Sequence, residues 1–93
     1  MREKIIEKEL VAKVKAMGGI APKFTSPGFD GMPDRLVLLP RGKMAFVELK
    51  APDRKPRALQ LARHRLLRRL GFKVYVIDEI NQIDSVLEEI DHE

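Results

Sequence analysis

The sequence contains no cysteine and no tryptophan, one tyrosine and only two histidines. The absence of cysteine excludes disulfides, thiolate zinc sites and a cysteine nucleophile. Two histidines are too few for a histidine-rich metal site. Aromatic residues make up only 5% of the chain, which argues against recognition of single strands by base stacking. The polar chemistry must therefore come from carboxylates, lysines and arginines.

Long apolar runs are also missing. No stretch approaches the roughly 20 residues of a membrane-spanning helix, and the charged start of the chain lacks the apolar core of a signal peptide. Yet 44% of the 93 residues are hydrophobic, which is more than a disordered chain contains. We therefore expect a soluble, cytoplasmic protein without a membrane partner, in which residues 1–93 form a single domain.

Basic residues are absent from the end of the chain and concentrated in its middle. The net charge of +4 divides into +1 for residues 1–34, +10 for residues 35–75 and −7 for residues 76–93. A basic block of this kind suits a polyanion, because cations that neutralise phosphates release condensed counterions. The distribution favours nucleic acid as the partner, with a solvated helix face as the ordinary alternative.

Hydrophobic periodicity predicts a mixed α/β fold in the order α-β-β-β-α-β-α, a mixed sheet flanked by helices. The expected elements are a helix over 3–17, a weak or edge strand over 20–25, a hairpin of strands 35–39 and 44–50, a helix from 56 to about 70, a strand over 73–77 and a helix over 80–90. On the second helix, we expect the inward-facing residues to be Leu59, Ala62, Leu66 and Leu70.

Charged side chains gather at the two strand ends that the hairpin would bring together. Asp34 opens the first strand, and Glu48 and Lys50 share one face at the end of the second. Two carboxylates at one open end repel each other unless a cation joins them, and hard oxygen ligands suit Mg²⁺ or Mn²⁺. Lys50 could orient or deprotonate a water that attacks phosphorus, or stabilise charge on the phosphate. A structural ion pair between Glu48 and Lys50 is the alternative.

These residues resemble the PD-(D/E)XK nuclease signature, with Pro33-Asp34 followed by Glu48-Leu49-Lys50. More narrowly, the chain resembles the stand-alone virus-type replication-repair nuclease (VRR-NUC) domains. The resemblance covers nearly the whole chain and includes an early helix with Glu7, the Gly18-Gly19 stop, the loop from Ser26 to Asp34, the Glu48-Leu49-Lys50 motif and Gln60. It implies a PD-(D/E)XK restriction-endonuclease-like core.

The resemblance also implies roles for the site residues. Asp34, Glu48 and the backbone carbonyl of Leu49 would bind the metal, and Lys50 would be the catalytic lysine. Gln60 would lie beside the site, for which a surface glutamine is the alternative. We place His64, one turn after Gln60, outside the catalytic set, because a helical histidine is more often a surface or packing residue.

Besides Glu9, the first helix offers two acids, Glu7 and Glu3, as candidates for the site. The resemblance implies that Glu7 helps to ligate the metal, through water or a second ion. Glu7 precedes Leu10 by three residues and Val14 by seven, so it lies at the edge of the buried stripe and its carboxylate could lean over the sheet. Glu3, one turn earlier, is the fallback if the helix phase differs. An ordinary helical ion pair is the alternative.

The combined expectation is a Mg²⁺- or Mn²⁺-dependent, structure-selective DNA endonuclease. Some small members of the family behave like Holliday-junction resolvases, so the resemblance implies branched or flapped DNA as substrate. The expected phosphate contacts are Lys23, Arg54, Lys55 and Arg57. Because one subunit presents one site, we expect a symmetric homodimer. The alternatives are a non-cleaving DNA-binding module and an accessory subunit of a replication or repair complex, whose acidic tail docks a basic partner.

Overall fold

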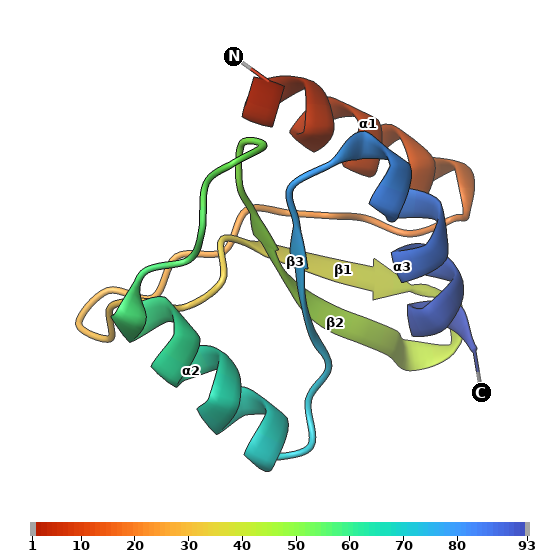
Figure 1. The fold of residues 1–93 in the computed structure, drawn as a ribbon. Coiled ribbons are helices and arrows are strands. Elements are labelled where there is room, and N and C mark those ends of the chain that lie inside the picture. The colour runs from red at the N-terminus through yellow and green to blue at the C-terminus, as the bar shows by residue number, and fades with distance from the viewer. Residues whose placement is uncertain (1, 93) are drawn as a thin grey trace.

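Helices cover both faces of a three-stranded sheet in the computed structural model, which describes residues 2–92 (Figure 1). The elements are α1 (Arg2–Ala16), β1 (Arg35–Leu39), a 3₁₀ turn (Pro40–Gly42), β2 (Lys43–Leu49), α2 (Ala58–Arg69), β3 (Val74–Ile77), a second 3₁₀ turn (Ile80–Gln82) and α3 (Ile83–Asp91). The strand order is β1-β2-β3, antiparallel in the β1–β2 hairpin and parallel between β2 and β3. The mixed α/β fold predicted from the sequence is therefore confirmed.

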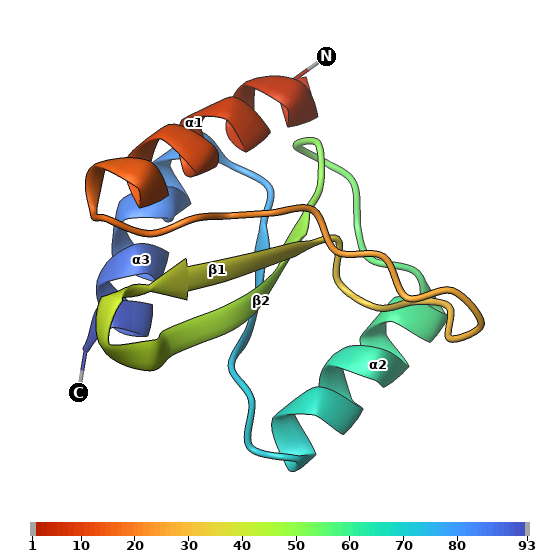
Figure 2. The same ribbon diagram turned by 180° about the vertical axis from the view of Figure 1, so that it is seen from behind.

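The face of the sheet under α1 and α3 holds the larger apolar core. Leu10 and Val14 of α1 and Ile83 of α3 are fully buried against Val47 of β2 and Ile77 of β3. Burial of each such side chain contributes roughly 1.5–3 kcal/mol. Figure 2 shows α1 and α3 side by side, both remote from α2. None of the helices within residues 2–92 is long and apolar enough to cross a bilayer.

Helix α2 covers the opposite face of the sheet, but not with the residues expected from its periodicity. Its buried residues are Gln60, His64 and Leu67, whereas Leu59 is 45% exposed and Leu70 is 63% exposed. The prediction of the buried stripe was wrong: the stripe is shifted by one residue, which is about 100° around the helix. The observed phase lets Gln60 donate to the buried Glu48 carboxylate of β2. It also lets Leu67 pack with Phe46 and Val74.

The segment over 20–25 follows the free edge of β1 as an interrupted strand. It makes isolated bridges at Ile20↔Leu38 and Lys23↔Arg35. Between them, Pro22 accepts a hydrogen bond from the Leu36 amide but has no N–H to return one. The missing donor breaks the ladder at its centre, so the weak edge strand is present only as these bridges.

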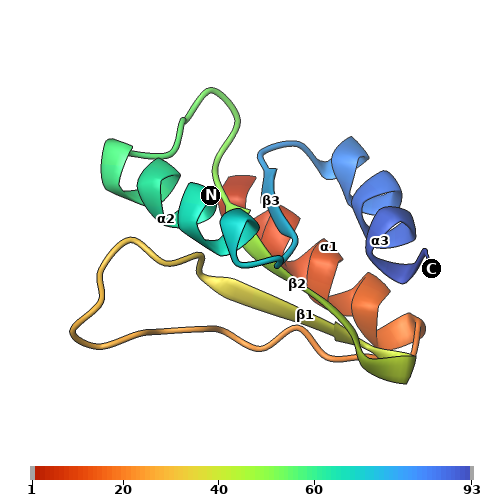
Figure 3. The same ribbon diagram turned by 90° about the horizontal axis from the view of Figure 1, so that it is seen from below.

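The acidic C-terminal block makes several contacts within the molecule. Lys13 of α1 pairs with Asp84 at 2.6 Å, and the Tyr75 hydroxyl donates to the Glu89 carboxylate at 2.6 Å. The Lys43 ammonium donates to the Asp91 carbonyl. Part of the negative charge of residues 76–93 thus meets donors from α1 and the sheet, and α3 is an integral layer of the fold (Figure 3).

Candidate active site

Asp34 and Glu48 lie at one end of the β1–β2 hairpin. The register Arg35↔Val47 places Asp34, the residue before β1, beside Glu48 on β2. The Leu49 amide donates to Asp34 Oδ1 at 3.2 Å, across the hairpin. Because the N–H and C=O of one strand residue point to the same side, the Leu49 carbonyl also faces the Asp34 side, beyond the last pair of the ladder.

The loop before Asp34 is held against the start of α2. The Arg63 guanidinium stacks on the Phe29 ring at 3.8 Å from its centroid and donates to the Asp30 carbonyl at 2.7 Å. Gly31 has φ +91°, and a Cβ there would lie 2.8 Å from Leu59 Cγ. Only glycine allows this close approach, and the loop then delivers Asp34 to the hairpin end.

Glu48 is almost completely buried, with 2% of its surface exposed. Burial and the nearby Asp34 carboxylate raise its pKa to about 7, against the opposing charge of Lys50. Burial also raises the pKa of Asp34, opposed by the hydrogen bond from the Leu49 amide. The Lys50 ammonium lies 3.6 Å from Glu48 Oε2. Two carboxylates that both resist ionisation therefore face one lysine.

Gln60 connects the start of α2 to the Glu48 carboxylate. Its Oε1 accepts the Arg57 backbone N–H at 2.8 Å, and its Nε2 donates to Glu48 Oε2 at 3.0 Å. Because an N–H can only donate, Arg57 fixes which end of the amide is oxygen, and the NH₂ group must face Glu48. Gln60 thus lies beside the carboxylate pair and contacts one of its members directly.

His64 follows Gln60 one turn later and is 1% exposed. Its Nε2 lies 3.7 Å from Glu48 Oε1, a distance too long for a hydrogen bond. Burial lowers the pKa of His64, as do the charges of Arg68 and Lys50. The residue placed outside the predicted set is therefore in the innermost part of the site.

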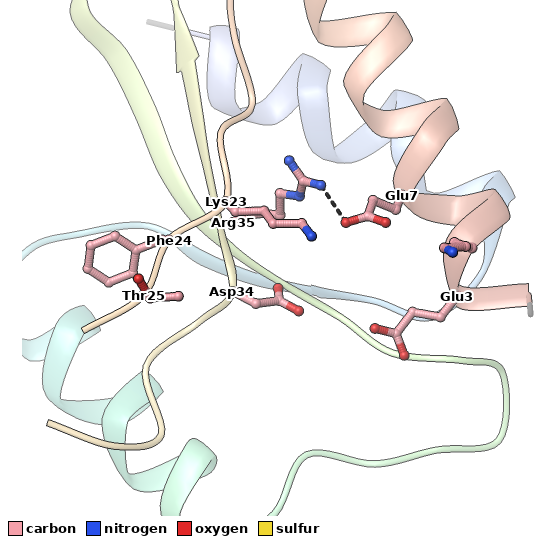
Figure 4. Close-up of a pocket in the computed structure, with 8 residues that line it drawn as sticks. Glu3, Glu7, Lys23, Phe24, Thr25, Asp34 and Arg35 are labelled. Atoms are coloured by element: carbon pink, nitrogen blue, oxygen red, sulfur yellow. Dashed lines mark hydrogen bonds and ion pairs between the residues drawn. The ribbon is translucent and has the colours of Figure 1, made fainter. Parts of the chain in front are cut away.

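Glu3 and Glu7 of α1 have different surroundings (Figure 4). Glu7 pairs with the buried Arg35 guanidinium, which lowers the pKa of Glu7. Glu3 has no such partner in the close-up, and its carboxylate faces Asp34 across a cavity of 760 Å³ that Lys23 also lines. The geometry favours Glu3 over Glu7 as the acid of α1 that faces the carboxylate pair.

A second cavity, of 310 Å³, opens on the other side of Glu3. It is lined by Lys50 together with the three basic residues of the connection to α2, Arg54, Lys55 and Arg57. The structure thus brings all three beside Lys50, whereas Lys23 lies in the cavity next to Asp34. Basic side chains flank the carboxylate pair on both sides.

The donor set fits a hard divalent cation. Within residues 2–92, no three His, Asp or Glu side chains form a metal-binding cluster, so the chain would supply two carboxylates rather than a closed cage. Mg²⁺ is commonly held in this way, by one or two carboxylates, with waters and substrate phosphates completing its shell. Glu48 Oε1 is buried without a hydrogen-bond partner, and the raised pKa values of Asp34 and Glu48 mark a pair that a cation would relieve.

Comparison with solved structures decides the family. A structure described as "VRR_NUC domain" matches with a TM-score of 0.87 and 36% sequence identity, covering 95% of this chain and 96% of that chain. The chain belongs to the VRR-NUC family. This VRR-NUC chain is also 53% identical, over 87 residues, to "Putative nuclease p44" of Acyrthosiphon pisum secondary endosymbiont phage 1, covering 94% of the chain and 92% of that protein. No family model matches the sequence.

Sequence reasoning did not single out Arg35 of this VRR-NUC site, and it placed His64 outside the catalytic set. Arg35 follows Asp34 directly, and its charge in an otherwise apolar strand was the available signal for a buried partner. His64 lies four residues after Gln60, so the two share a helix face. That spacing was noticed, but the wrong helix phase concealed that the shared face is buried.

Proposed function

We propose that this VRR-NUC nuclease is a metal-dependent DNA endonuclease. The observation that carries the proposal is the convergence of Asp34, Glu48 and Lys50 at one end of the hairpin. Phosphodiester hydrolysis needs a group that organises a nucleophilic water and positive charge to stabilise the pentavalent transition state. The carboxylate pair could hold a metal that organises the water, and Lys50 could supply positive charge next to the phosphate.

Asp34, Glu48 and the Leu49 carbonyl would hold Mg²⁺ or Mn²⁺. The bound ion would polarise the phosphoryl oxygen, lower the pKa of a water and stabilise the leaving oxygen. Lys50, 3.6 Å from Glu48 Oε2, would orient that water or neutralise charge on the phosphate. Gln60 would hold Glu48 in its ligating orientation through the 3.0 Å hydrogen bond.

An acid of α1 would contact the metal through a water molecule. We assign this role to Glu3 in preference to Glu7, because Glu7 is already neutralised by Arg35. Glu3 lines both cavities beside the carboxylates. It would reach a metal through water rather than directly, since the described residues contain no cluster of three acids.

The DNA backbone would bind through the basic residues on either side of the site, Lys23, Arg54, Lys55 and Arg57. Such contacts recognise phosphates and shape rather than sequence. We propose branched DNA, such as Holliday junctions or flaps, as the preferred substrate. Each chain presents one carboxylate pair, so symmetrical cutting of two strands would require a homodimer.

The test compares wild type with Glu48→Gln on four-way junctions, flaps and linear duplex, with Mg²⁺, Mn²⁺ or EDTA. We expect cleavage of branched DNA that needs the metal and falls by roughly 10³-fold in Glu48→Gln. Glu88→Gln, which removes an exposed acid of α3, is the matched control and should cleave normally. Cleavage that survives Glu48→Gln would exclude this site. DNA binding without cleavage, and without Mg²⁺ uptake, would identify a non-cleaving module instead.

A further inference from the structure

Three buried polar atoms around Glu48 have no hydrogen-bond partner. They are Glu48 Oε1 and both ring nitrogens of His64. Buried polar side-chain atoms are nearly always paired, because the desolvation of an unpaired one is not compensated. The fold nevertheless gives His64 a fully buried position that an apolar residue would occupy without this cost. An unpaired histidine in that position therefore calls for a functional explanation.

The position of the ring supplies one. His64 Nε2 and Glu48 Oε1 face each other at 3.7 Å, and a shortening of well under 1 Å would make a hydrogen bond. An imidazole with its proton on Nε2 donates to the carboxylate, whereas the other tautomer would turn a lone pair toward negative charge. Lys50 and Arg68 are the charged groups that influence the ring besides Glu48, and both are cationic.

Helix α2 thus presents two donors, one turn apart, to the two oxygens of one carboxylate. Gln60 Nε2 already donates to Oε2 at 3.0 Å, and His64 Nε2 faces Oε1. Two donors at fixed positions would define the plane of the carboxylate, and each oxygen would keep a lone pair for a ligand. Partners of this kind behind metal ligands typically change metal affinity or activity 10–100-fold.

We propose that His64 is a positioning residue, which donates from Nε2 to Glu48 Oε1 and, with Gln60, fixes the carboxylate in the orientation required for metal binding. The inference rests on the proposed function of Glu48 as a metal ligand. It also explains why α2 buries Gln60 and His64 while Leu59 stays exposed. His64 itself touches neither substrate nor metal in this role.

The first experiment compares His64→Leu with His64→Gln. Leucine fills the same space but leaves the buried Glu48 Oε1 without its donor, so the variant should still fold, while Mn²⁺ affinity and kcat fall roughly 10–100-fold. The amide NH₂ of glutamine can take the place of Nε2–H, and His64→Gln should recover most of both losses. If His64 only packs, leucine should preserve Mn²⁺ affinity and kcat at least as well as glutamine does. That result would overturn the proposal.

The second experiment needs no activity. The ¹⁵N chemical shifts of the His64 ring, measured without metal, should report a proton on Nε2 and none on Nδ1. A ring protonated on Nδ1 would overturn the proposal. Because this measurement uses the wild type, it decides the question even if His64→Leu does not fold. If the wild type binds no Mn²⁺ and cuts no DNA, the proposed function fails, while the tautomer still decides whether His64 pairs with Glu48.

Discussion

The face of the sheet under α1 and α3 is apolar over most of its area, whereas the face under α2 combines a small apolar cluster with buried polar groups. Leu10, Ile83 and their neighbours form one continuous core. Across the sheet, Phe46, Leu67 and Val74 form a smaller cluster, and it ends where α2 places Gln60 and His64 on Glu48. The same strands alternate between the two environments, so a one-residue step along β2 leads from the main core to the site.

The α1/α3 face therefore contributes mainly to stability, and the α2 face carries the candidate site. The α1/α3 side of the molecule has little to contribute to the site, apart from Glu3 at the start of α1, which lines both cavities beside the carboxylates. The α2 face accepts an unfavourable burial of polar groups, which raises the pKa of Glu48 and keeps the carboxylate in place. A domain of this size can bury unpaired polar groups on one face because the opposite face supplies most of the apolar burial.

Truncation in the main core should have the largest effect on stability. Leu10→Ala removes a fully buried side chain of α1 and should lower the free energy of unfolding by about 2–5 kcal/mol. Leu70→Ala makes the same chemical change at a position that is 63% exposed, and should stay within about 0.5 kcal/mol of wild type. Urea unfolding measures both. Equal losses in the two variants would contradict the contrast between a buried core and an exposed α2 surface.

Titration of Glu48 should make stability depend on pH. The pKa of Glu48 is about 7 in the folded protein and 4.5 by its ordinary value, so the folded state holds this proton more tightly than the unfolded chain. The stabilisation is complete below pH 4.5 and is lost as the pH rises through about 7. Between pH 4.5 and 8, without metal, wild type should therefore lose up to about 3 kcal/mol relative to Glu48→Gln.

Differential urea unfolding of wild type and Glu48→Gln across this pH range isolates the effect. Both proteins share the titrations of Asp34, whose pKa burial raises, and of His64, whose pKa burial lowers. The difference between the two curves therefore reports Glu48 and its coupling to these neighbours. Addition of Mg²⁺ at pH 8 should restore the wild type but not the variant. Parallel curves at all pH values would show that Glu48 ionises normally.

Glu3 and Glu7 of α1 should respond differently to removal of their charge. Glu7→Gln leaves the buried Arg35 guanidinium without its partner and should cost about 1–2 kcal/mol of stability. Glu3→Gln changes an exposed side chain and should alter stability by less than about 0.5 kcal/mol, but should weaken Mn²⁺ binding. Thermal unfolding and Mn²⁺ calorimetry on the pair measure both quantities. Reversal of the pattern would return the metal-facing role to Glu7.

Sequence reasoning could predict the hairpin and the convergence of Asp34 with Glu48, because turn residues and two-residue alternation decide both locally. It could not choose the phase of α2. The leucine stripe and the Gln60–His64 stripe follow the same helical period. What separates them lies on the sheet, where Glu48 accepts a hydrogen bond from Gln60, and Phe46 and Val74 pack with Leu67. Likewise, helix periodicity placed Glu7 near the site but could not reveal that Arg35 would hold it.

The first turn of α1 contributes to the walls of both cavities beside the carboxylates, because Glu3 lines each of them. The end of α3 lies on the far side of the molecule from α2 (Figure 3). A label attached before α1 would therefore lie closer to the site than one attached after α3. A fluorophore, surface tether or affinity handle joined after α3 would leave the approach to Asp34 and Glu48 open, whereas one joined before α1 would stand at its entrance.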